Sequence, residues 1–270
     1  MDIPLGKPTT YSDQLDAGLL APMSRAEARR ALGVGTTLPF RGGDVWNGYE
    51  FSWLNARGRP EVAGLRLIID AGSPGFIESK SLKLYLNSYA QSRFPNQDAV
   101  RARLQQDLSA GFGETIAVML MATTALPAAN DALPGVSLDG LDIDIDVYSR
   151  DPDCLAVSRD AGVSVEETLH THLFRSLCPV TGQPDWASVL VRYQGPPIDH
   201  ARLLRYLVSY RTHPAFHEST IEQIFIDLKA RCGCTALAVT GYFQRRGGLD
   251  INPTRTDGLW TGAARRLPRQ

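Results

Sequence analysis

The chain has 270 residues, of which 43% are hydrophobic and 21% charged, a composition that suits a soluble globular protein with one large or two ordinary domains. Its 28 basic and 29 acidic side chains leave a formal net charge of −1, so no overall field favours duplex nucleic acid or an anionic membrane. These values direct the search towards small-molecule chemistry.

Residues 1–7 lack a basic stretch followed by an apolar run, so we expect no secretory signal. The longest apolar stretch, 116–129, is too short to span a bilayer. We therefore expect a cytoplasmic protein with no membrane partner. In that reducing compartment the four cysteines are expected to be free thiols: Cys154, Cys178, Cys232 and Cys234.

The first 43 residues are rich in Pro, Gly, Thr and Ser, and they contain one short helical pattern at 24–32 with a capping box at Ser24 and Glu27. This segment is expected to be an N-terminal arm. Two strands are predicted next, at 48–54 and 65–70, joined by a turn that contains Gly and Pro.

A helical pattern begins at Glu78, where large apolar side chains recur at i, i+3, i+4 and i+7. A second helix is predicted at 98–109, and a strand at 115–124. After a loop, residues 141–148 alternate strictly between apolar and acidic or polar side chains. That alternation predicts a half-buried strand.

The same order of elements recurs in the second half of the chain. A strand is predicted at 186–193, helices at 199–210 and 218–230, and a strand at 234–243, with Gly233 available to end the second helix. Both halves therefore run strands, helices, strands, which predicts a tandem α+β duplication with mainly antiparallel sheets. The repetition is in element order, because residue identity between the halves is low. We expect an arm at 1–43, a first module at 44–135 and a second module at 136–270.

Cys178 lies in a loop punctuated by Pro and Gly, and Asp185 follows it seven residues later. No second cysteine stands at a disulfide or metal spacing from Cys178. A thiol in such a loop with one nearby acid favours a nucleophile over a packing residue.

Three residues at a predicted helix start, Glu78, Ser79 and Lys80, lie where unpaired backbone N–H groups favour an anion. The alternative is that Glu and Ser are simply good first-turn residues and Lys80 is solvated. Another helix opens with His217 and Glu218, and such a histidine can pass a proton to a bound heterocycle near neutral pH. The alternative there is a surface histidine beside a first-turn acid.

The turn that contains Arg246 and Gly247 follows a predicted strand, and guanidinium and glycine backbone groups can hold phosphate. A basic turn between strands is the alternative. Three other patterns are incomplete. Residues 33–38 lack the third glycine of a dinucleotide fingerprint, 142–146 lack the glycine and the Glu of a calcium loop, and 232–234 lack a second cysteine pair for structural zinc.

Four segments together resemble one family: Glu-Ser-Lys-Ser-Leu-Lys-Leu-Tyr at 78–85, Cys-Pro-x-Thr-x-Gln-Pro-Asp at 178–185, Phe-His-Glu at 216–218, and Arg-Arg-Gly-Gly-Leu-Asp-Ile-Asn-Pro at 245–253. They stand in the order found in the NADPH-dependent 7-cyano-7-deazaguanine reductases (QueF) of the long, two-module form. The resemblance implies a tunnelling fold, in which ββααββ modules form antiparallel sheets with helices on one face. It also implies a homodimer.

The same resemblance implies reduction of a nitrile to a primary amine with two NADPH, through a cysteine thioimidate, on the route to queuosine in tRNA. The enzyme would act on the free base, so no direct contact with nucleic acid is expected.

The resemblance also implies roles for single residues. Cys178 would be the nucleophile, Asp185 the proton donor, and His217 a further proton source or a substrate ligand. The substrate would be bound by Ile77, Glu78, Ser79, His217 and Glu218. NADPH would be bound by Ser79, Lys80, Arg246 and Gly247, and no metal is expected.

Two other functions stay open on the sequence alone. A zinc-dependent cyclohydrolase of the same general fold also binds a purine-like ring through a helix-start Glu, but it needs several Cys and His ligands. A non-catalytic purine-binding module needs neither Cys178 nor Asp185. With the expected boundaries, Glu78 falls in the first module and Arg246 in the second, so we expect neither module to be active alone.

Overall fold

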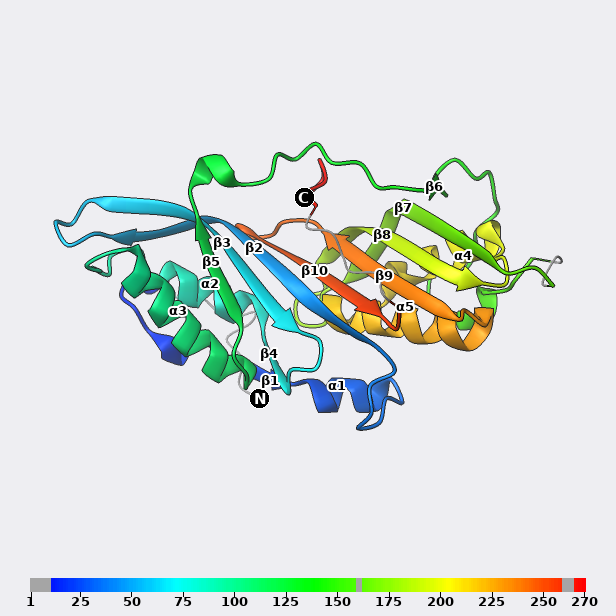
Figure 1. Ribbon diagram of the computed structural model, residues 1–270, viewed down its shortest axis with the longest axis horizontal. Helices are drawn as coiled ribbons and strands as arrows, with labels where there is room; N and C mark the ends of the chain where they lie inside the picture. Colours follow the sequence, from blue (N-terminus) through cyan, green and yellow to red (C-terminus); the bar gives the residue numbers. More distant parts are fainter. Residues whose placement is uncertain (1–10, 159–161, 259–264) are drawn as a thin grey trace. The chain divides into compact units, whose positions relative to one another are not determined.

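The computed structural model describes residues 11–158, 162–258 and 265–270 (Figure 1). Its contacts divide the chain into two compact units. The first contains residues up to Thr37, 43–128 and 245–251, and the second contains 38–42, 129–244 and 252–270. Of the expected arm, residues 1–10 lie outside the described part of the chain.

The first unit is built on three antiparallel strands in the order β5-β3-β2, with two helices on one face (Figure 1). Alternate residues of β3, Leu65, Leu67 and Ile69, are fully buried against these helices. The elements are β2 (Arg41–Leu54), β3 (Pro60–Asp70), α2 (Ser79–Asn87), α3 (Gln97–Phe112) and β5 (Ala117–Met121), with η1 (Ala17–Leu19), β1 (Pro22–Ser24), α1 (Arg25–Ala31), β4 (Gly75–Ile77) and η2 (Thr123–Ala125) around them.

Local sequence accounts for the helix bounds of the first unit. The Ser24 side chain accepts a hydrogen bond from the Glu27 amide, which confirms Ser24 as the cap of α1. Asn96 caps α3 by accepting from the Ala99 amide at 2.9 Å, and α3 ends at Gly113, whose φ of +78° is left-handed.

The second unit has the antiparallel strands β9, β8 and β7 in that order, with β10 beside β9 and β6 parallel to β7. Helices α4 and α5 cover one face (Figure 1). The elements are β6 (Val136–Ser137), η3 (Pro152–Cys154), β7 (Val165–Leu177), β8 (Pro184–Gly195), α4 (His200–Val208), η4 (Ser209–Thr212), α5 (His217–Cys232), β9 (Ala236–Phe243) and β10 (Leu249–Thr256). As predicted, α5 ends at Gly233, with a φ of +63°.

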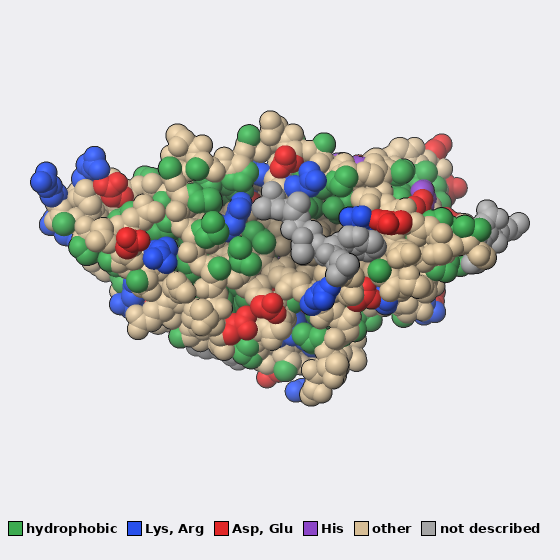
Figure 2. Space-filling model, in the orientation of Figure 1, with side chains coloured by type: hydrophobic (Ala, Val, Ile, Leu, Met, Phe, Trp, Pro, Cys, Tyr) green, Lys and Arg blue, Asp and Glu red, His purple; other side chains and the backbone are tan. Residues whose placement is uncertain are grey.

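Both units run two strands, two helices and a strand in chain order, and the second continues into β10. The α+β fold class with antiparallel sheets and helices on one face is therefore confirmed. Basic and acidic side chains are interspersed on the face shown in Figure 2, in keeping with the balanced charge of the chain.

The strand predicted at 141–148 is wrong, because this segment has no regular secondary structure. Its alternation is real: Ile143, Ile145 and Val147 are half-buried and pack against the core of the second unit. The partners of its backbone, however, are not a neighbouring strand: Arg205 donates to the Asp144 carbonyl at 3.1 Å, and the Thr212 amide of η4 donates to the Tyr148 carbonyl at 3.1 Å. An alternating sequence pattern indicates which side chains are buried, but a β-strand also needs a neighbouring strand to which its backbone can hydrogen-bond.

The expected module boundaries at 44–135 and 136–270 stay predictions. The compact units change over near residue 128, and they group Arg245–Ile251 with the first unit, so Arg246 belongs with the unit that contains Glu78. Within the described residues, no helix has the length and apolar character needed to cross a membrane.

Candidate functional site

Cys178 lies in the turn between β7 and β8 in the second unit. Its amide donates to the Gln183 carbonyl at 2.9 Å, and its carbonyl accepts from the Gly182 amide at 3.0 Å. The φ of Gly182 is +69°, a left-handed value that favours glycine. These bonds fix the backbone on both sides of the thiol, which is partly exposed and not in a disulfide.

Asp185 lies at the start of β8, opposite Ser176 of β7. Both residues are almost fully buried, at 2% and 1% exposure. The Asp185 carboxylate lies 4.0 Å from Nε2 of His217, whose ring packs edge-on against Phe243 with the ring centres 3.9 Å apart. A carboxyl and an imidazole are thus close together in a buried setting, where each can hold or pass a proton.

Backbone pairing brings the start of α5 next to the Cys178 turn. The Leu177 amide donates to the His213 carbonyl at 2.9 Å, and the Leu177 carbonyl accepts from the Ala215 amide at 3.1 Å. Helix α5 begins two residues later at His217, followed by Glu218, which is 4% exposed. Four of the predicted residues, Cys178, Asp185, His217 and Glu218, therefore gather at one end of the second unit.

The other predicted residues lie in the first unit. Ile77 is fully buried at the end of β4, and Glu78 caps α2. The two carboxylate oxygens of Glu78 accept from the amides of Lys80 at 2.9 Å and Ser81 at 2.8 Å. The sequence suggested that the helix start is open to an anion, but Glu78 itself occupies these amides. Glu78 is 3% exposed, and these two hydrogen bonds fix the orientation of its carboxylate.

Arg246 and Gly247 form a tight turn before β10, closed by a 2.9 Å hydrogen bond from the Arg246 amide to the Leu249 carbonyl. Gly247 and Gly248 have φ values of +58° and +82°. A Cβ on Gly247 would lie 3.0 Å from Cδ of Lys83. The missing side chains leave backbone accessible in a cavity of about 230 Å³ lined by Gly48, Glu50, Phe51, Lys83, Leu86, Asn87, Gly247, Gly248 and Leu249.

This turn fits a phosphate-bearing cofactor chemically. Bare glycine backbone lets a phosphate approach main-chain N–H groups, and Lys80, Lys83 and Arg246 belong to the same unit and carry cations. A metal ion would need at least three ligand side chains close together. Within residues 11–158, 162–258 and 265–270, no group of three His, Cys, Asp or Glu side chains is placed to hold one.

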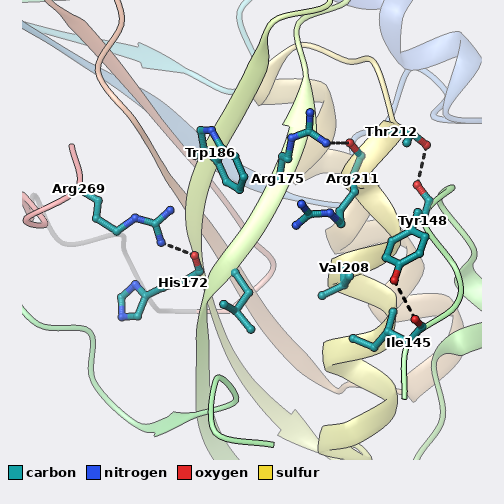
Figure 3. A pocket seen from close by; sticks show the side chains of 10 residues that line it. Ile145, Tyr148, His172, Arg175, Trp186, Val208, Arg211, Thr212 and Arg269 are labelled. Atoms are coloured by element: carbon teal, nitrogen blue, oxygen red, sulfur yellow. Dashed lines mark hydrogen bonds between the residues drawn. The ribbon is translucent and has the colours of Figure 1, made fainter. Parts of the chain in front are cut away.

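A larger cavity, of about 690 Å³, lies in the second unit and was not foreseen from the sequence (Figure 3). Arg175 and Arg211 place their guanidinium carbons 5.5 and 5.8 Å from the Trp186 ring. Trp186 follows Asp185, but successive residues of a strand point to opposite faces. None of the predicted site residues lines this cavity.

Two family models match the chain. Residues 11–120 match the model described as nitrile reductase, 7-cyano-7-deazaguanine-reductase N-term, and residues 184–259 match the model of QueF-like proteins. Curated relatives named NADPH-dependent 7-cyano-7-deazaguanine reductase include the protein of Burkholderia thailandensis, 53% identical, and that of Burkholderia multivorans, 52% identical. Each alignment covers 94% of this chain and 93% of the relative.

Among solved structures, the archaeosine synthase QueF-Like in its apo form is 20% identical, with a TM-score of 0.31. The match covers 36% of this chain and 96% of that chain.

Proposed function

Because this chain belongs to the 7-cyano-7-deazaguanine reductase (QueF) family of nitrile reductases, we propose that it reduces 7-cyano-7-deazaguanine to 7-aminomethyl-7-deazaguanine with two NADPH. The observation that carries the proposal is the turn that presents the Cys178 thiol six residues before the start of β8, followed by buried Asp185 with the partly buried His217 at 4.0 Å from its carboxylate. This would be a step in queuosine biosynthesis.

The first chemical step uses Cys178 and Asp185. The sulfur attacks the nitrile carbon, a C–S bond forms, and one π bond of the C≡N group breaks. Asp185 supplies the proton that the nitrogen takes up, and the product is a thioimidate on Cys178. The thiol loses one proton and the nitrile nitrogen gains one, so the thiol and the nitrile add to give the thioimidate with no net uptake or release of protons.

Bound NADPH would supply a hydride to each of two carbon–nitrogen double bonds. After the first reduction the C–S bond breaks, which releases the Cys178 sulfur and leaves an imine. A second hydride and a proton give the amine, so the sum is a nitrile, two NADPH and two protons giving an amine and two NADP⁺. We assign the later proton to His217, and the 4.0 Å between its imidazole and the Asp185 carboxylate supports this assignment.

For the substrate, we assign Glu78 to the guanine-like N–H edge, because a carboxylate can accept two N–H groups at once. Its orientation is already fixed by the amides of α2. Ile77, Ser79, His217 and Glu218 complete the proposed substrate set. For NADPH we assign Ser79, Lys80, Arg246 and Gly247, supported by the glycine turn and the cations of the first unit.

We also propose that the protein works as a homodimer in the cytoplasm. The homodimer rests on the family resemblance, and the compartment rests on four cysteines that form no disulfide. The free base is the proposed substrate, so the protein itself needs no contact with tRNA.

Intact-protein mass spectrometry tests the function directly. The protein is incubated with the nitrile in the absence of NADPH, and we expect a mass increase equal to one nitrile molecule, which maps to Cys178. Cys178→Ala should show no increase and no turnover. An unmodified wild-type protein, or an active Cys178→Ala variant, would contradict the proposal. Stoichiometric zinc whose removal stops turnover would instead support a cyclohydrolase-like enzyme.

A further inference from the structure

The turn between β2 and β3 in the first unit has the same pattern of backbone hydrogen bonds as the Cys178 turn in the second, although the Cys178 turn is one residue longer. The Asn55 amide donates to the Arg59 carbonyl at 2.9 Å, and the Gly58 amide donates to the Asn55 carbonyl at 2.9 Å. Gly58 has a φ of +82°, which makes it the counterpart of Gly182. By this correspondence Asn55 stands where the second unit has Cys178.

The chain segments beside the two turns are equivalent as well. The Leu54 amide donates to the Ser92 carbonyl at 3.0 Å, and the Leu54 carbonyl accepts from the Phe94 amide at 2.9 Å. Leu177 makes the same pair of bonds with the segment before α5, as described above. The correspondence therefore extends beyond the turn to the segment that leads into the second helix of each unit.

The two acids occupy equivalent places on their strands. Glu61 follows Pro60, and Asp185 follows Pro184, at the start of β3 and β8 respectively. Each proline is the ladder partner of the leucine that precedes its turn. Glu61 is therefore the counterpart of Asp185.

The residue before the proline differs in charge between the hairpins. In the first unit it is Arg59, whose guanidinium donates to Oε1 of Glu61 at 2.6 Å, and the Asn55 amide group donates to the same oxygen at 2.9 Å. These hydrogen bonds, that of Arg59 first, hold the pKa of Glu61 below its ordinary value. A carboxylate kept ionised cannot donate a proton. The first hairpin thus offers neither a thiol nor a proton donor.

In the second unit the position of Arg59 is occupied by Gln183, which is exposed and uncharged. Gln183 and Asp185 are two residues apart, so in extended chain their side chains project to the same side. Among the groups near Asp185 is His217, whose Nε2 lies 4.0 Å from the carboxylate, and Glu218 follows His217 on α5.

We propose that Gln183 is a positioning residue for the proton donor: its uncharged side chain fills the place of a guanidinium and leaves the Asp185 carboxyl able to carry a proton. The hairpin 54–61 is then the catalytically silent counterpart of the hairpin 177–185. Differences at three equivalent positions separate them, with Cys178, Gln183 and Asp185 in the one and Asn55, Arg59 and Glu61 in the other.

The inference rests on the proposed role of Asp185, so its test includes a measurement that needs no turnover. The carboxyl carbon of Asp185 is followed by carbon-13 NMR over pH in the ligand-free protein, in the wild type, Gln183→Arg and Gln183→Met. A cation within about 4–6 Å favours the ionised carboxylate, so in Gln183→Arg the carboxyl should titrate at lower pH. Gln183→Met keeps the length without the charge and should titrate as the wild type does.

Steady-state kinetics give the second readout. A donor must be protonated, so a lower carboxyl pKa moves the alkaline limb of the kcat profile of Gln183→Arg to lower pH, by roughly one unit, which is about tenfold in kcat on that limb. KM for the nitrile should stay within about twofold, because Gln183 is not among the residues proposed to recognise the base and because a lower carboxyl pKa acts on proton donation, which is a kcat effect. Arg59→Gln should raise the pH at which Glu61 titrates and leave kcat unchanged.

Two results would overturn the inference: an Asp185 titration in Gln183→Arg that matches the wild type, or a Gln183→Met variant that shifts as far as Gln183→Arg. The first result would show that a positive charge at position 183 does not affect the ionisation of the Asp185 carboxyl. The second would show that the shift in titration does not come from the charge. Failure of the proposed function has a different signature, since the wild type would then form no nitrile adduct on Cys178 while the titrations still shift.

Discussion

The hydroxyl oxygens of Tyr206 and Tyr210 lie 2.8 Å apart in the core of the second unit, and Tyr206 also donates to the Asp227 carboxylate at 2.6 Å. The first unit repeats this arrangement: Tyr85 and Tyr89 hydroxyls are 2.8 Å apart, and Tyr85 donates to an aspartate of α3 at 2.9 Å. Each unit thus joins its two helices through a buried pair of tyrosines and one carboxylate, and this polar link is present in both halves of the duplication.

The link makes a stability prediction. Tyr206→Phe removes the donor to buried Asp227 and should lower the free energy of unfolding by about 1–3 kcal/mol, the cost of leaving a buried polar group with one partner fewer. Urea unfolding measures it. Tyr148→Phe is the matched control, since Tyr148 is 47% exposed and its change should stay within about 0.5 kcal/mol. Equal losses in both variants would contradict the prediction.

Thiol reactivity should single out Cys178. Burial raises the pKa of Cys232 to about 12 and that of Cys234 to about 11, and burial also raises the pKa of Cys154. Because thiolates are the reactive form, these three stay protonated and unreactive near pH 8. Brief treatment of the folded protein with iodoacetamide, followed by peptide mapping, should modify Cys178 alone. Cys178→Ser should take up no label, and labelling of Cys232 at a similar rate would show that the burial is not maintained in solution.

Asp185→Asn keeps the shape of the side chain and removes the proton donor. Loss of a general acid is expected to lower kcat by about 100-fold to 10,000-fold. The Kd for the nitrile, measured by calorimetry with Cys178→Ala in both proteins so that no adduct forms, should change little, since Asp185 is not among the residues proposed to recognise the base. A variant that turns over at the wild-type rate would remove Asp185 from the mechanism.

The glycine turn gives a prediction for NADPH. Gly247→Ala places a Cβ 3.0 Å from Cδ of Lys83 in a backbone conformation, φ +58°, that alanine rarely adopts. We expect about 1 kcal/mol or more of strain and a weaker Kd for NADPH, by about tenfold, measured by quenching of protein fluorescence. Gly35→Ala is the control, because a Cβ there meets nothing within 4 Å and no left-handed φ is required. Unchanged NADPH affinity in Gly247→Ala would separate this turn from the cofactor site.

Helices of this chain were predictable because their signals are local. Glu78 and Asn96 cap helices, Gly113 and Gly233 end them, and their apolar positions recur at helical spacing. Strand β10 was missed for the opposite reason. Its residues are buried but largely polar, and partners far away in the sequence satisfy them, as in the 2.9 Å pair of Arg255 with Glu222. Hydrophobic periodicity does not reveal such a strand.

The duplication shows a second limit of the sequence. The residues Leu-x-x-Tyr-Leu-x-Ser-Tyr occur at 82–89 and again at 203–210, yet overall identity between the halves is low. Only the hydrogen bonds show which of the repeated residues matter: Ser88 and Ser209 each donate to the carbonyl three residues earlier at 2.6 Å, and the tyrosines meet a carboxylate. The site residues named from motifs were found in two groups, but the counterpart of Cys178 in the first unit could be recognised only from backbone bonds.

Main-chain atoms close the turn that carries Cys178, through the bonds to Gln183 and from Gly182, and the Thr181 hydroxyl adds a bond by accepting from the Gln183 amide at 3.4 Å. The main-chain closure does not depend on the side chains at 179 and 180, provided that Gly182 keeps its left-handed φ. Those two positions are therefore open to randomisation in directed evolution. Libraries confined to them would vary the entrance to the nucleophile while its backbone stays fixed, a route to reductases that accept nitriles other than the natural one.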